Sequence, residues 1–200
     1  MLWNTFSRFF HAMENFCASF PRYGKLFSTL WKTALALLIT LPAAAPAARV
    51  VEDFAPATVS AWTPYQKAPR PVAAATGIAF PLPFSKAVDR AAWDKPVALD
   101  LSAATAFEID LACPRPEAIR QFGLYFKSDS GWYAAGKPMP GPGLQTLVFA
   151  KADFSTEGAP AGWNRIDAIR LSPWKGEALD AALVLHRIAA VEGGSLVVVR

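Results

Sequence analysis

The stretch FGLYFKSDSGWY, Phe122–Tyr133, predicts a β-hairpin and with it the fold class of the chain. Apolar side chains alternate up to Lys127, Ser128–Gly131 has the composition of a turn, and the residues from Trp132 form the return strand. With Ser128–Gly131 as a four-residue hairpin loop, Lys127 pairs with Trp132, and paired residues share a face of the sheet.

The expected pairing assigns each hairpin side chain to one face, because side chains alternate along a strand. Tyr125, Lys127 and Trp132 are predicted to lie together outside the core, while Tyr133 turns inward. A register slip of one residue would exchange Trp132 and Tyr133.

Similar short runs recur along the rest of the chain, and no internal repeat is present. Further strands are expected over 50–54, 97–101, 107–111, 145–151, 166–172 and 182–189. The Pro- and Gly-rich segment 136–143 is predicted to be a loop. Many short strands at roughly ten-residue spacing, with turn residues between them, favour an all-β, antiparallel β-sandwich or jelly roll.

The first 47 residues have the order of a secretory signal peptide. A weakly basic region precedes the apolar run TALALLITL, Thr33–Leu41, which is too short to span a bilayer, and Ala/Pro-rich residues follow. Ala45-Pro46-Ala47 supplies a cleavage site, and Met13 is an alternative start. We therefore expect a secreted or periplasmic protein without a membrane span in its mature form.

The charge of the mature chain gives no support for a nucleic-acid partner. Four of the 20 Lys and Arg residues and one of the 16 Asp and Glu residues precede Ala48, which leaves 16 against 15 and a net charge of about +1. Cys17 is in the signal and Cys113 is alone, so an internal disulfide is excluded. We expect one binding module over 48–192, and in 193–200 a linker or the first strand of a following domain.

Alternation along the later strands suggests a ligand-binding face. Ile169 and Leu171 are predicted to point inward, and Arg170 and Ser172 outward. The acidic strands would add the outward carboxylates of Asp100, Glu108 and Asp110 to the same face. Aromatic rings stack on the C–H surfaces of a pyranose and charged groups bind its hydroxyls, so such a face is typical of a sugar site.

Each of these residues also has a purely structural interpretation. Outward carboxylates on strands are usually only solvated, and Trp93, Trp163 and Trp174 at strand ends are as easily explained as plugs of the sandwich. The residues predicted to bind a ligand are Tyr125, Lys127, Trp132, Arg170 and Trp174.

Four segments together resemble the galactose-binding-like jelly rolls: VEDF at 51–54, WDKPVALDLS at 93–102, the hairpin at 122–133, and GWNRIDAIRLSPW at 162–174. That family includes many carbohydrate-binding modules of exported bacterial polysaccharide-degrading enzymes. The resemblance covers roughly Val50 to Val191. It implies a non-catalytic module that binds a polysaccharide or oligosaccharide, attached to a catalytic domain in a longer chain.

The resemblance also implies a structural calcium ion between the first strand and a late one, and no other cofactor. The matching positions are Glu52 or Asp53 together with Asp180. The last strand departs from the family pattern, because Leu185-His186-Arg187 stands where such modules often carry an Asp. Calcium needs six or more oxygen ligands, and the sequence does not supply that set.

Two alternatives remain open at this stage. The domain is either a structural spacer that contacts only a neighbouring domain, or a small glycan-active enzyme that uses Glu108 and Asp110. These two acids alternate on one strand, about 7 Å apart by strand rise, a separation found in inverting glycosidases. The sequence has no G-x-S-x-G motif and no Gly-rich phosphate loop, and His186 is the only histidine after the signal.

Overall fold

The computed structural model describes residues 47–193. The predicted signal peptide at 1–47 and the predicted linker or strand at 193–200 therefore lie almost entirely outside the described residues. No helix within 47–193 has the length and hydropathy needed to cross a membrane. The strands are β1 Ala47–Glu52, β2 Thr63–Tyr65, β3 Val72–Ala74, β4 Gly77–Leu82, β5 Ala92–Leu99, β6 Ala104–Ala112, β7 Ile119–Ser128, β8 Gly131–Lys137, β9 Leu144–Ala150, β10 Ser155–Glu157, β11 Ile166–Lys175 and β12 Ala181–Glu192. Three short 3-10 helices join them: η1 Pro56–Ala61, η2 Pro116–Ala118 and η3 Lys151–Asp153.

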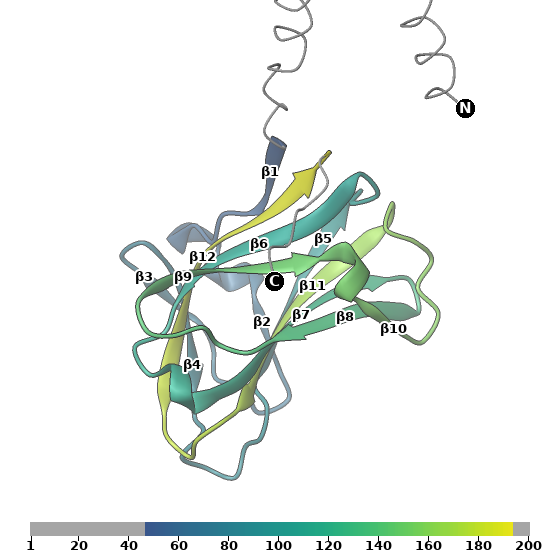
Figure 1. Ribbon diagram of the computed structural model, residues 1–200. Helices are drawn as coiled ribbons and strands as arrows, with labels where there is room; N and C mark the ends of the chain where they lie inside the picture. The colour runs from purple at the N-terminus through teal and green to yellow at the C-terminus, as the bar shows by residue number, and fades with distance from the viewer. Residues whose placement is uncertain (1–46, 194–200) are drawn as a thin grey trace, which may run out of the picture. The chain divides into compact units, whose positions relative to one another are not determined.

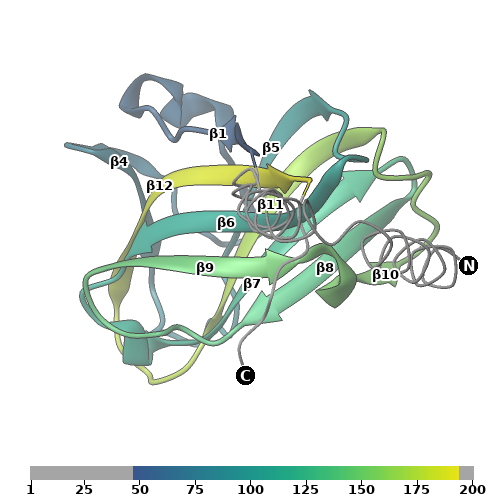
Figure 2. The same ribbon diagram turned by 45° about the horizontal axis from the view of Figure 1, so that its top comes forward.

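The strands form two antiparallel sheets packed face to face, as the sequence predicted (Figure 1). Sheet A has the order β3-β4-β12-β6-β9, and β1 pairs with the second half of β12. Sheet B has the order β10-β8-β7-β11-β5-β2. Figure 2 shows β12, β6 and β9 in one layer and β11, β7 and β8 in the other.

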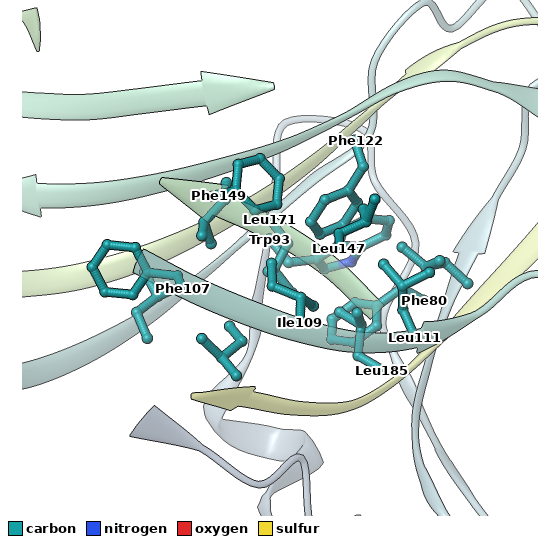
Figure 3. Close-up of a cluster of buried hydrophobic side chains, with 14 of the residues drawn as sticks. Phe80, Trp93, Phe107, Ile109, Leu111, Phe122, Leu147, Phe149, Leu171 and Leu185 are labelled. Carbon is teal, nitrogen blue, oxygen red and sulfur yellow. The ribbon is translucent and has the colours of Figure 1, made fainter. Parts of the chain in front are cut away.

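The core fills the space between the sheets with the inward side chains of both. The predicted inward residues Phe107, Ile109, Ile169 and Leu171 are all 0–1% exposed. Figure 3 shows part of this layer, in which the ring of Phe122 from sheet B and that of Phe149 from sheet A have centroids 6.5 Å apart. Apolar residues at every second position thus bury one face of each sheet, which is the main source of stability for a sandwich without a disulfide.

The hairpin register is the one predicted. Lys127 pairs with Trp132 and Phe126 with Tyr133, so Tyr133 turns inward and is only 8% exposed. The ladder continues one pair further than expected, to Ser128 and Gly131, which shortens the connection to two residues. Asp129, the first of these, has a φ of 53°, a left-handed conformation that Asp tolerates in tight turns.

Other elements differ from prediction at their ends. The opening strand stops at Glu52, because Phe54 has a φ of 47° and its ring leaves the strand to stack on Trp62, with centroids 5.3 Å apart. β5 begins at Ala92, five residues earlier than expected. Sequence reasoning missed four strands altogether, β2, β3, β4 and β10.

Candidate functional site

The outer face of sheet B carries a continuous row of aromatic rings and guanidinium groups. We call it the aromatic–arginine row, and its members are Tyr65, Asp94, Arg170, Trp132, Tyr125, Arg90 and Trp174. The residues come from β2, β5, β11, β8 and β7 and from the chain just before β5. Cross-strand pairing aligns them, because Arg170 lies opposite Tyr125 on one side and Asp94 on the other.

Arg170 is at the centre of the row. Its Nε and Nη2 donate to the two carboxylate oxygens of Asp94, at 2.6 and 2.8 Å. Its guanidinium carbon lies 4.3 Å from the ring centroid of Tyr65 and 4.3 Å from that of Trp132. These contacts leave the side chain 15% exposed, and the hydrogen bonds to Asp94 raise the pKa of Arg170. The charge is therefore fixed in position and neutralised locally.

Arg90 forms the second guanidinium position. Its Cζ lies 5.3 Å from the ring centroid of Tyr125 and 4.9 Å from that of Trp174, and its Nε donates to the Ser172 hydroxyl. A β-bridge between Arg90 and Trp174 holds the backbone in place. Tyr125 meets Trp132 edge to face, with centroids 6.4 Å apart and planes at 83°, and so joins the two halves of the row.

Small residues beneath the row allow the large side chains to lie across the sheet. Gly123 pairs with Gly136 on β8 and with Ser172 on β11. A Cβ at Gly123 would come within 2.9 Å of Cε2 of Tyr125 and 3.0 Å of the Ser172 carbonyl oxygen. The Tyr125 ring thus occupies the space that a side chain at position 123 would need, and the glycine lets this ring lie close to the sheet.

The structure brings together four of the five residues predicted to bind a ligand. Tyr125, Trp132, Arg170 and Trp174 are members of the row. Lys127 lies on the same face opposite Trp132, but its ammonium group donates to the Asp129 carbonyl at 2.6 Å. The clustering agrees with the predicted face, while the binding role of these five residues stays a prediction.

Sequence reasoning missed Tyr65, Asp94 and Arg90. Tyr65 belongs to a three-residue edge strand that contains Pro64, too short to be predicted by alternation. Asp94 precedes the strand predicted over 97–101, but it belongs to β5 and lies opposite Arg170. Arg90 lies outside the twelve strands of the described residues, so alternation along a strand cannot place its side chain.

The prediction that the acidic strand shares a face with the aromatic residues is wrong. Glu108 and Asp110 lie on β6 in sheet A, on the opposite side of the sandwich from the row. Arg187 contacts both, with Nε 2.8 Å from Asp110 and Nη2 3.7 Å from Glu108. Asp110 also accepts a hydrogen bond from Thr146 at 2.7 Å. Strand alternation predicts which face a side chain takes, but not to which sheet its strand belongs.

Two of the three uncertain tryptophans belong to the core. Trp93 is 0% exposed, and its Nε1 donates to the Pro69 carbonyl at 2.7 Å. Trp163 stacks on Tyr133 at a centroid distance of 4.1 Å and lies beneath the ammonium group of Lys151 at 5.0 Å. Trp174 alone lies on the outer face.

The residues implied for a calcium ion do not fit a common site. Glu52 pairs with Ile188, eight residues along β12 from Asp180, which corresponds to roughly 26 Å of strand. Glu52 is 5% exposed and forms an ion pair with Lys95, while Asp180 accepts a hydrogen bond from the Ser85 amide at 2.9 Å. Within 47–193, no group of three or more His, Cys, Asp or Glu residues converges on one point.

Comparison with known proteins adds information on the fold. No protein-family model matches the sequence, and no curated protein matches it. The structure is similar to part of the agarase AgWH50C, with a TM-score of 0.54, 14% identity, and coverage of 74% of this chain and 25% of that one. An exo-β-agarase gives a TM-score of 0.53, 11% identity and coverage of 74% and 26%. The family 11 carbohydrate-binding module of the Clostridium thermocellum cellulase Lic26A-Cel5E gives a TM-score of 0.49 and 15% identity, with coverage of 75% of this chain and 97% of that one.

The two-sheet antiparallel β-sandwich that the resemblance predicted is confirmed, and part of each agarase has a similar fold. The chain spans about a quarter of the length of the two agarases. At identities of 11–15% this likeness concerns the fold alone, and function depends on the site.

Proposed function

We propose that this chain is an exported, non-catalytic glycan-binding module whose site is the aromatic–arginine row on sheet B. It acts as the accessory part of a longer protein that also contains a glycan-active catalytic domain. The observation that carries the proposal is Arg170, held between two aromatic rings and fixed by Asp94 on a solvent-facing sheet.

The row combines the two kinds of group that a sugar requires. Indole and phenol rings provide apolar surface and polar edges, and guanidinium N–H groups donate to hydroxyl oxygens. Because each guanidinium is already stacked on aromatic rings, little side-chain entropy is lost when a ligand binds. A rigid arrangement of this kind favours binding over chemistry, since the row contains one carboxylate and Arg170 already occupies both its oxygens.

Support for an accessory role comes from two further observations. The first 47 residues have the composition of an export signal, and glycans outside the cell are substrates for exported enzymes. The fold also occurs within agarases, where the matched part is about a quarter of a larger enzyme chain.

Affinity electrophoresis tests the proposal directly. The purified chain is run through native gels that contain a panel of neutral and acidic polysaccharides, beside Trp132→Ala and Arg170→Ala. Arg187→Ala is the matched control, because this arginine also pairs with a strand carboxylate but lies on sheet A. We expect at least one polysaccharide to retard the chain and the control. The apparent affinity of the two row variants for that polysaccharide should be at least tenfold lower.

Two results would contradict the proposal. Absence of retardation by every polysaccharide would favour a structural spacer that contacts a neighbouring domain. Equal retardation of the row variants and the control would place the glycan site elsewhere on the sandwich.

A further inference from the structure

The two guanidinium groups of the row differ in their electrostatic environment. Arg170 forms a bidentate ion pair with Asp94. Among residues 47–193, by contrast, no carboxylate oxygen lies within ion-pair distance of Arg90. The Nε of Arg90 donates to Ser172, and its terminal nitrogens make no hydrogen bond to the described part of the chain. Arg90 is therefore a cation with unused donors.

The Arg90 side chain is held in place despite the absence of a counter-charge. Stacking between Tyr125 and Trp174, the hydrogen bond to Ser172 and the backbone bridge to Trp174 restrict its rotamers. The side chain is half-buried, so its charge is less well solvated than that of an extended surface arginine. A fixed, partly desolvated cation next to a proposed ligand site is well suited to bind an anion.

We propose that the glycan bound by the row carries anionic groups and that Arg90 binds them. This inference rests on the proposed function and specifies its substrate class. The planar guanidinium fork matches a planar or tetrahedral oxyanion with two parallel N–H···O bonds, a geometry that carboxylates and sulfates share. The ligand group is thus either the carboxylate of a uronic acid or a sulfate ester on a sugar ring.

Matched pairs of polysaccharides separate these two sources. The first pair is polygalacturonate and its fully methyl-esterified form, and the second is a carrageenan and its chemically desulfated form. Affinities of the purified chain for each are measured by gel retardation and by titration calorimetry, at 20 and 200 mM NaCl. We expect the acidic member of one pair to bind about tenfold to a hundredfold more tightly than its neutral partner, with the preference reduced by salt.

Variants of Arg90 test the assignment. In Arg90→Gln the ratio of acidic to neutral affinity is expected to fall to about one. Arg90→Lys retains the charge but loses the fork, and is expected to retain part of the preference. Arg187→Gln, on the opposite sheet, is the control and should preserve the full ratio. Unfolding midpoints identify any variant that fails to fold, and in that case the wild-type comparison and Arg90→Lys still decide the question.

Three results would overturn the inference. Equal affinity for both members of both pairs would overturn it alone and leave glycan binding intact. An unchanged ratio in folded Arg90→Gln would show that Arg90 only supports the neighbouring rings. No binding to any polysaccharide would overturn the proposed function and this inference together.

Discussion

Coupling between Arg170 and Asp94 can be predicted from their exposure. The Arg170 side chain is 15% exposed and that of Asp94 30%, so the pair lies between a solvated surface pair and a fully buried one. Surface pairs contribute about 0–1 kcal/mol, and truncation of a fully buried pair costs about 3–5 kcal/mol. With both hydrogen bonds charge-assisted, we expect a coupling free energy of about 1–2 kcal/mol.

The single variants should differ in a defined way. Asp94→Asn loses only the pair, about 1–2 kcal/mol of unfolding free energy. Arg170→Met also loses two cation–π contacts at about 0.5–1 kcal/mol each, which brings its cost to about 2–4 kcal/mol. For a domain of this size each kcal/mol corresponds to roughly 2–4 °C in Tm.

Urea unfolding monitored by Trp fluorescence gives the free energy of unfolding of the wild type, the two single variants and the double variant. The coupling free energy follows from these four values as a double-mutant cycle. The control cycle is Arg187→Met with Asp110→Asn, a pair with exposures of 38% and 23%. Within the part of the chain that the structure describes, Arg187 makes no cation–π contact. We expect the control coupling to stay below about 1 kcal/mol. A coupling in the row no larger than in the control would refute the view that Asp94 and the rings hold Arg170 rigidly.

Three further predictions concern other parts of the sandwich. Lys95→Met leaves the 4% exposed Glu52 side chain without its cation and should lower the free energy of unfolding by about 3–5 kcal/mol. A second change, Glu52→Gln, should largely restore that stability. Because Lys95 supplies the positive charge beside Glu52, we also expect EDTA to leave the Tm unchanged in calorimetry. The hydrogen bond from the Ser85 amide lowers the pKa of the Asp180 carboxyl from 3.8. The charged carboxylate therefore stabilises the fold above about pH 4, and this stabilisation is lost as pH falls through the lower pKa of the folded state. In Asp180→Asn the Tm should fall less steeply over that acidic range. Gly123→Ala forces the Tyr125 ring away from the sheet and should cost about 1–3 kcal/mol and weaken glycan retardation, whereas unchanged retardation would show that the height of the ring is irrelevant.

The hairpin was predictable because two independent signals agreed on it. Alternation from Phe122 to Lys127 fixes the faces, and the short turn fixes the register that places Trp132 opposite Lys127. The position of Arg170 on the outer face followed from the same alternation of side chains along a strand. Sandwich architecture followed in turn from the number and spacing of such runs.

The composition of the site was less predictable, because it depends on contacts between distant segments. Alternation cannot show that Asp94 lies opposite Arg170, since that pairing joins residues 76 positions apart. It also assigned the Glu108 strand to the wrong sheet, because the two sheets of a sandwich have the same inward–outward pattern. Arg90 lies outside the strands, where no periodicity constrains the direction of a side chain.

The pairing of β1 with β12 has a mechanical consequence. Ala47 lies opposite Glu192, so the two ends of the described region are neighbours in one antiparallel ladder (Figure 1). A tension that pulls these ends apart acts across the hydrogen bonds and breaks them one pair at a time, starting from the ends. This peeling proceeds at low force until it reaches Glu52, which Lys95 anchors to sheet B. A chain held under load at both ends would thus lose β1 before any strand that carries the aromatic–arginine row.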